Sequence, residues 1–362
     1  MKNKGNKKQV DRRSFLRHTL VGSLGAPLLF MVPGGFTNAN TSQLVYPENS
    51  QKRPLSIDGK PFRGMFPIMQ TPYHEDGEID LEVIRKEVNF IVASGAKGMA
   101  WPQLASEFYV LSDEERMTVA EVIVSEADGR LPVIIGVQSN SYWKVALDFA
   151  KHAESIGADG IISLPPYTGN ATVEMSVSYF ETLAETVDLP VFIQNTGGKY
   201  GPSMPIGKVV GLGKKYPHVY YIKEEGSPVT HRIGAMVEQG KEVFGGVFSG
   251  ADGTTLLNEL RRGCAGSMTG VGLVDIYSKI YDSFIGGEHE KAQEMFDKLM
   301  SFYVFKSKAG WLPTEKAVLM ERGIFKNTKM RVAPFDLQWD EVDRQEFHVL
   351  FEGLKPYFHV KS

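Results

Sequence analysis

The sequence predicts an α/β fold, a parallel (β/α)8 barrel of the TIM type with a C-terminal helical extension. Short apolar runs typical of strands alternate with longer amphipathic stretches of helical periodicity between about residues 62 and 269. Eight such runs occur, and no dinucleotide-binding glycine fingerprint follows any of them, which disfavours an open doubly wound sheet. The composition, 42% hydrophobic and 23% charged over 362 residues, is that of an ordinary globular protein.

The expected strands are short and rich in apolar residues. In chain order they are 65–69, 98–101, 133–137, 160–164, 191–194, 219–222, 243–247 and 266–269.

The expected helices follow the strands and carry N-terminal signals. Asp80 can cap the first, whose apolar residues recur at helical spacing, and Ser112 with Glu115 forms a capping box for the second. The remaining helical patterns within the barrel are 141–156, 173–186, 206–214, 229–238 and 254–261. Three more, at 290–305, 313–321 and 340–354, predict a helical layer added to the barrel.

The N-terminus has the features of an export signal. Four lysines precede the segment Asp11–Arg17, which contains Arg12-Arg13, and an apolar run extends from Leu20 to Val32. This order is typical of a twin-arginine signal, whereas a plain basic tail is the alternative. We expect a signal peptide at 1–39, a lead-in at 40–61, the barrel at 62–287 and the helical layer at 288–362, with the mature protein periplasmic or otherwise extracytoplasmic. The apolar run is shorter than the ~20 residues of a membrane-spanning helix, so no stable membrane insertion is expected after signal removal.

Charge and cysteine content narrow the function further. The net charge of −3 does not suggest a nucleic-acid partner. A single cysteine, Cys264, excludes an internal disulfide framework and any multi-cysteine metal site. None of the eight histidines forms a close pair at metal-ligand spacing, so we expect neither a metal nor another cofactor.

The sixth strand carries the most reactive candidate. Four strand-forming residues, 219–222, lead directly into Lys223, Glu224 and Glu225. Burial disfavours the ammonium form of a lysine, and the neutral amine can form a Schiff base with a carbonyl substrate. The alternative is a solvated lysine at a strand end.

In such barrels the C-terminal ends of the strands form the active-site rim. This rule places several candidate site residues together, although the presence of each one at a strand end has a simple structural explanation. They are Lys223, Gln194-Asn195, residues 164–167 with Tyr167, residues 103–107 and Ser249-Gly250.

A set of motifs, taken in order, is similar to a known family. They are Met65 to Gly77 with Thr71-Pro72, Glu107 with Leu111–Arg116, Ala127–Val133, Pro165-Pro166-Tyr167, Asn195, Ile222-Lys223-Glu224, Ser249-Gly250 and Gly263–Gly266. Together they resemble the dihydrodipicolinate synthase / N-acetylneuraminate lyase family over residues 62–334. The resemblance implies a (β/α)8 barrel, a homo-oligomer (dimer or tetramer), and Lys223 as the lysine that forms a Schiff base with a 2-oxo acid.

The departures from the family pattern affect its proton relay. Gln103-Leu104-Ala105-Ser106-Glu107 replaces the family's Gly-Thr-Thr-Gly-Glu, although backbone N–H groups there can still bind a carboxylate. Gln194 replaces the tyrosine that shuttles protons, and an amide is neither an acid nor a base near neutral pH. The resemblance also implies that Lys199 stands for a basic residue after that strand and that Tyr167 retains the second tyrosine.

We therefore expect a metal-independent Schiff-base lyase or aldolase acting on a 2-oxo acid, with sugar-derived acids as candidates. The expected catalytic residues are Lys223 and Tyr167, with His74 or Glu107 as other proton carriers. The alternative is an exported binding or sensing protein for an oxo acid or sugar acid; a metal-dependent aldolase lacks clustered ligands. The expected substrate-binding residues are Gln194, Asn195, Ala105, Ser106, Lys199, Ser249 and Gly250.

Overall fold

The computed structural model describes residues 60–139 and 143–360. The predicted export signal and nearly all of the predicted lead-in lie outside these residues. The described part belongs to one compact unit, Pro47–Ser362. No helix in this part of the chain is long and apolar enough to cross a membrane.

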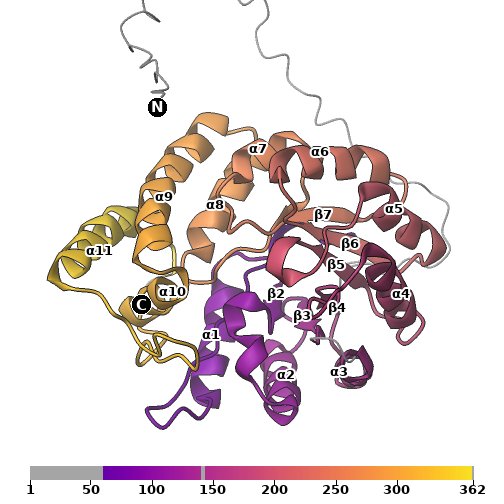
Figure 1. The fold of residues 1–362 in the computed structure, drawn as a ribbon. Helices are drawn as coiled ribbons and strands as arrows, with labels where there is room; N and C mark the ends of the chain where they lie inside the picture. The colour runs from indigo at the N-terminus through magenta and orange to yellow at the C-terminus, as the bar shows by residue number, and fades with distance from the viewer. Residues whose placement is uncertain (1–59, 140–142, 361–362) are drawn as a thin grey trace, which may run out of the picture. The chain divides into compact units, whose positions relative to one another are not determined.

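Eight parallel strands form the barrel, as predicted, in the spatial order β1-β8-β7-β6-β5-β4-β3-β2. A parallel bridge between Ile68 and Ala100 joins the segment after β1 to β2 and closes the circuit. Figure 1 shows helices around the outside of these strands. The strands are β1 (Gly64–Met65), β2 (Met99–Trp101), β3 (Val133–Gly136), β4 (Gly160–Ser163), β5 (Val191–Asn195), β6 (Val219–Glu224), β7 (Gly246–Ser249) and β8 (Gly266–Ser267).

The helices begin where their capping residues predict. The Asp80 carboxylate accepts from the Val83 N–H at 3.1 Å, and Ser112 and Glu115 make both bonds of a capping box. The helices are α1 (Leu81–Ala93), α2 (Asp113–Ala127), α3 (Trp143–Ser155), α4 (Val173–Ala184), α5 (Ile206–Lys215), α6 (Val229–Gly240), α7 (Leu256–Arg261), α8 (Val274–Ile285), α9 (His289–Ala309), α10 (Trp311–Glu321) and α11 (Glu341–Leu354).

The seventh strand was misplaced by the sequence analysis, and one helix was missed. The seventh strand is Gly246–Ser249 instead of 243–247, because the N–H groups of Val243, the last residue of a turn, and of Phe244 after it both donate to the carbonyl of Gly240. Helix α8 was not predicted, and its N-cap residue, Leu273, has no side chain that can cap a helix. The sequence therefore lacked the signal that marked α1 and α2.

Aromatic side chains fill the barrel interior beneath the lysine. Phe192 of β5 and Tyr221 of β6 stack at 4.5 Å between ring centroids, with Phe62 and Phe248 packed nearby. Side chains two residues apart on a strand share a face, so Tyr221 and Lys223 both point inward. The aromatic layer thus forms a solid floor, and polar chemistry is confined to the layer above it.

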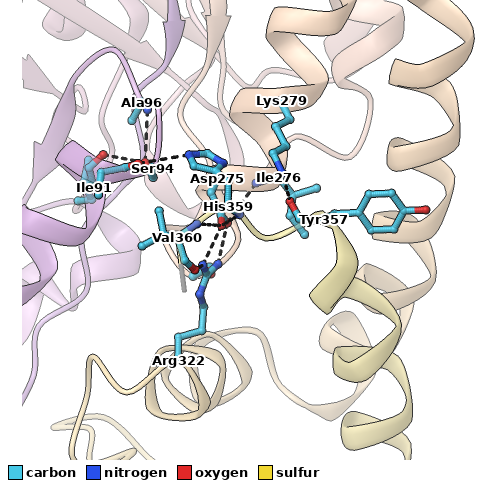
Figure 2. A network of polar contacts seen from close by, with 12 residues as sticks. Ile91, Ser94, Ala96, Asp275, Ile276, Lys279, Arg322, Tyr357, His359 and Val360 are labelled. Carbon is cyan, nitrogen blue, oxygen red and sulfur yellow. Dashed lines mark hydrogen bonds and ion pairs between the residues drawn. The ribbon is translucent and has the colours of Figure 1, made fainter. Parts of the chain in front are cut away.

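The C-terminal layer is fastened to α8 by a buried ion pair (Figure 2). Arg322 donates to both carboxylate oxygens of Asp275, at 2.6 and 2.7 Å, and to the carbonyl of Val360 at 2.8 Å. The backbone N–H of His359 also donates to Asp275. Because the side chains of Arg322 and Asp275 are almost completely buried, water cannot solvate their charges, and each side chain neutralises the charge of the other.

Candidate active site

Lys223 lies inside the barrel at the C-terminal end of β6 and is only 4% exposed. It lines a cavity of about 580 Å³, a size typical of small-molecule sites. The cavity is also bounded by Ala105, by Gly250 and Asp252 after β7, and by Trp311 at the start of α10. The structure therefore places the predicted nucleophile, Ala105 and Gly250 together.

Glu225 lines the cavity beside Lys223, and the sequence analysis did not name it as a site residue. Its Oε1 lies 3.6 Å from Nζ of Lys223, and its Oε2 accepts a 2.6 Å hydrogen bond from Nε2 of Gln194. A Cβ atom on Gly250 would stand 2.4 Å from Cδ of Glu225, so only glycine there leaves room for this carboxylate. Strand alternation was the available signal, because residue 225 follows residue 223 by two.

Gln194, a predicted substrate contact, is fully buried and is not among the lining residues, so its contact with substrate stays a prediction. It pairs in register with Lys223, and its amide nitrogen is occupied by Glu225. Its Oε1 has no hydrogen-bond partner among the described residues. Gln194 thus holds the Glu225 carboxylate beside the lysine.

The segment that replaces the family's hydroxyl-rich motif presents a different surface. Gln103, Leu104 and Ala105 line the cavity. Ser106 does not, because its hydroxyl donates to the Met69 carbonyl and accepts from the Gln103 N–H. The Oε1 atom of Gln103 is buried and has no hydrogen-bond donor among the described residues.

Glu107 and His74, the other proposed proton carriers, lie elsewhere. Glu107 forms a 2.7 Å ion pair with Lys316, and both side chains are completely buried. Lys316 also donates to the carbonyl of Thr71, so the pair secures α10 to the barrel. His74 is half exposed, lies 3.5 Å from Asp80 and does not line the cavity.

Two more predicted substrate contacts, Asn195 and Ser249, are buried and are not among the residues that line the cavity. Asn195 donates to Glu224 at 2.9 Å, and its Oδ1 accepts from the Met204 N–H at 2.8 Å. Ser249, the last residue of β7, is completely buried and is not among the lining residues. Lys199 lies in a short 3₁₀ turn, Gly198–Tyr200, and its side chain lies outside what the structure describes.

Tyr167 is half-buried and packs edge-on against Phe108, with ring centroids 6.2 Å apart. Burial raises the pKa of its hydroxyl, and the nearby Arg116 guanidinium opposes this shift. Tyr167 does not line the cavity, whereas Tyr109, Tyr200 and Tyr303 do. Its catalytic role stays a prediction.

A buried charged cluster lies against the cavity at Asp252. Lys306 donates to Asp252 at 2.8 Å and to Glu315 at 2.5 Å, and Nε1 of Trp311 donates to Asp252 at 2.6 Å. Burial lowers the pKa of Lys306, but the two carboxylates outweigh it, so the pKa is raised and the ammonium persists. Lys306 is therefore a poor nucleophile. Within residues 60–139 and 143–360, no three His, Cys, Asp or Glu side chains are grouped to hold a metal ion.

Comparison with known proteins gives a consistent family. A profile of the dihydrodipicolinate synthetase family matches residues 61–352. A 4-hydroxy-tetrahydrodipicolinate synthase from Rhizobium meliloti (strain 1021) is 30% identical over 268 residues, 73% of this chain and 85% of the relative. An L-2-keto-3-deoxyarabonate dehydratase from Azospirillum brasilense is 25% identical over 272 residues, 74% of this chain and 87% of the relative.

A further relative and a solved structure are also similar to this chain. A probable 2-dehydro-3-deoxy-D-pentonate aldolase from Escherichia coli (strain K12) is 32% identical over 58% of this chain and 69% of the relative. A dihydrodipicolinate synthase structure from Rhodopseudomonas palustris superposes with a TM-score of 0.75 at 23% identity, covering 83% of this chain and all of that one. These likenesses support the barrel fold, and the curated relatives are lyases and aldolases.

Proposed function

The chain belongs to the dihydrodipicolinate synthetase family, and from that premise we propose that it is a Schiff-base-forming lyase acting on a sugar-derived 2-oxo acid. Because the family's curated relatives are lyases and aldolases, an enzyme of this type is expected. The observation that carries the proposal is the 3.6 Å separation between Nζ of Lys223 and Oε1 of Glu225 inside one cavity. A nucleophilic amine and a proton-carrying carboxylate then face the same substrate.

The first steps follow from these two groups. Lys223 adds to C2 of the oxo acid and water leaves, which produces an iminium ion. The Glu225 carboxylate takes a proton from C3, the C–H electron pair becomes the C2–C3 double bond, and the iminium nitrogen accepts the displaced π electrons. The result is a neutral enamine attached to Lys223.

The fate of C4 then decides the reaction. In a dehydration, the enamine electrons return toward C3–C4 as the C4 hydroxyl departs, and Glu225 gives back its proton to form water. In an aldol cleavage, Glu225 instead takes the C4 hydroxyl proton from the iminium, and the C3–C4 pair forms the enamine. After the cleavage, Glu225 returns its proton to C3 of the enamine, which restores the iminium. Hydrolysis of the iminium then releases Lys223 in both cases. One carboxylate can thus perform the proton transfers that the family assigns to a tyrosine.

A hydroxylated substrate suits the polar atoms of the site. Gln103 lines the cavity, and its buried amide oxygen has no donor among the described residues; we propose that a substrate hydroxyl donates to it. The cavity of about 580 Å³ has room for a five- or six-carbon acid. Relatives named for keto-deoxy sugar acids point the same way. We place the substrate carboxylate against the backbone of Leu104 and Ala105.

Borohydride reduction with a panel of 2-oxo acids tests the proposal. Mass spectrometry should find the reduced adduct on Lys223, none in Lys223→Ala, and none on Lys306 or Lys316, which are buried and paired with carboxylates. Turnover should survive a chelator. An adduct on another lysine would remove the central claim, and an adduct on Lys223 without turnover would favour the binding-protein alternative.

Two further features belong to this proposal. We propose export through the twin-arginine segment Asp11–Arg17, which would place the enzyme in an extracytoplasmic compartment. We also propose a homo-oligomer, as the family resemblance implies; a solved monomeric dihydrodipicolinate synthase variant shows that this fold also exists as a monomer.

A further inference from the structure

The cavity wall made by the C-terminal layer carries charges that the proposed reaction does not use. Asp252 and Glu315 are negative and share one cation, Lys306, so this buried cluster has a net negative charge. Both oxygens of the Asp252 carboxylate are occupied, by Lys306, by Trp311 and by the N–H of Gly270. The cluster is therefore fixed in place and offers no free cation to an incoming anion.

The other charged residues that line the cavity do not offset the negative charge of this cluster. Among the described lining residues, Lys223 is the basic side chain, and it is committed to the imine. Glu225 adds a second carboxylate to the lining beside Asp252. A substrate with an anionic group against the Asp252 wall would face a cluster of net negative charge in a partly desolvated site.

Tyr303 of α9 supplies the polar group on this wall. It lines the cavity and is half-buried, and its hydroxyl makes no hydrogen bond with any described residue. Burial raises the pKa of this hydroxyl, and Asp252 raises it further, whereas Lys306 opposes the shift. The hydroxyl is therefore neutral, and it can both donate to and accept from a substrate hydroxyl.

We propose that Tyr303, with the acidic cluster behind it, is a specificity determinant that selects an uncharged, hydroxylated tail on the 2-oxo acid. This inference rests on the proposed function. It adds that the C-terminal helices recognise the end of the substrate farthest from the carboxylate. Tyr303 binds the terminal hydroxyl of the substrate. The Asp252–Lys306–Glu315 cluster disfavours a second carboxylate or a phosphate at the same place.

Three substrates that share carbons C1 to C4 separate these effects. They are 2-oxo-3-deoxypentonate, with a terminal hydroxyl; 4-hydroxy-2-oxopentanoate, with a methyl group there; and 4-hydroxy-2-oxoglutarate, with a carboxylate. The mature wild-type enzyme should use the pentonate with the highest kcat/KM and the glutarate with the lowest. In Tyr303→Phe, the ratio of kcat/KM for the pentonate to that for the pentanoate should fall about three- to tenfold, the loss of one hydrogen bond.

A matched control is Tyr357→Phe. Tyr357 donates to the exposed Glu294 on the outside of the molecule, so its removal should leave the substrate ratio unchanged. An equal loss on pentonate and pentanoate in Tyr303→Phe would show a merely structural effect and overturn the inference. Efficient use of the glutarate would overturn the electrostatic part.

Binding to Lys223→Ala separates this inference from the proposed chemistry. Calorimetry with the same three acids should show the pentonate bound most tightly and the preference weakened when Tyr303→Phe is added. If wild-type Lys223 is not trapped by borohydride, the proposed function fails, and this binding order still decides whether Tyr303 recognises the tail. Equal affinities for pentonate and pentanoate in Lys223→Ala would refute the recognition of the substrate tail by Tyr303.

Discussion

Gln194 donates a 2.6 Å hydrogen bond from Nε2 to Oε2 of Glu225, which joins β5 to the end of β6 beside Lys223. The amide cannot carry a proton, but it can fix the position of a carboxylate that does. In the function that we propose, the work of one family tyrosine is divided between two residues. Gln194 positions the carboxylate, and Glu225 transfers the proton.

The first prediction concerns Glu225→Gln. The variant keeps the shape of the side chain and one oxygen that can accept from Gln194, but it removes the base. Turnover of the best 2-oxo acid should fall by about 10²–10⁴-fold, the usual contribution of a positioned acid–base group. Borohydride should still trap pyruvate on Lys223, because the nucleophile remains. Glu238→Gln, at an exposed ion pair with Lys241, is the control. Turnover within a few-fold of wild type would assign proton transfer to another group.

The second prediction is a pH-dependent stability effect at Glu87. This side chain is completely buried; Oε1 accepts from the Gln70 N–H at 2.7 Å, while Oε2 has no partner among the described residues. Burial raises the pKa of Glu87 well above its usual range. The unfolded state loses this proton above an ordinary carboxyl pKa of about 4.3, whereas the folded state retains it up to the raised pKa. Between these two pKa values, the free energy of unfolding falls as the pH rises.

Glu87→Gln should remove this dependence, because the amide oxygen can still accept from Gln70 without ionising. The gain in Tm over wild type should grow between pH 5 and pH 8, as measured by thermal unfolding. Glu82→Gln on the same helix is the control: Glu82 is exposed and its pKa is lowered by its hydrogen bond to Lys86. A Tm difference for Glu87→Gln that shrinks with rising pH would contradict the assignment.

The third prediction concerns the buried pair of Figure 2. Arg322→Met leaves Asp275 buried without its cation, which should cost about 3–5 kcal/mol in the free energy of unfolding. Arg85→Met removes an exposed partner of Glu126 and should cost less than about 1 kcal/mol. Urea denaturation measures both costs, and similar values for the two variants would mean that burial does not strengthen the Arg322 pair.

Sequence patterns predicted the barrel and its lysine because both depend on local signals. Strand and helix periodicity identify the elements, and parallel topology brings strand ends to one rim. The patterns could not say which polar rim residues face the cavity. Asn195 and Ser106 are held by internal hydrogen bonds, whereas Glu225 faces Lys223 because Gly250 leaves space for it. Such pairings join residues far apart in sequence and depend on packing, so no local pattern reports them.

The fourth prediction is export. The twin-arginine segment predicts that the mature chain begins near Asn40 and accumulates outside the cytoplasm. Changing Arg12 and Arg13 to Lys should retain the protein inside, as seen by cell fractionation and by the N-terminal sequence of the purified chain. Substitution of Lys7 and Lys8 by Arg keeps the basic charge and serves as the control. An unprocessed cytoplasmic wild-type protein would reject this prediction.

The last prediction is that purified protein has negligible dihydrodipicolinate synthase activity, although relatives of 27–32% identity are named 4-hydroxy-tetrahydrodipicolinate synthases. The synthase reaction condenses the pyruvate enamine with aspartate semialdehyde, and the family resemblance assigns its proton relay to a tyrosine and a hydroxyl at positions that are Gln194 and Leu104 here. Glu225 can replace the relay for deprotonation of C3. However, the second substrate brings its own carboxylate into a cavity whose described lining already contains Glu225 and Asp252. A coupled assay with both substrates should therefore give a rate far below that of a genuine synthase, while Lys223 remains open to trapping by pyruvate. A rate comparable to that of a synthase would show that the acidic wall does not exclude a carboxylate, and that our account of the site is wrong.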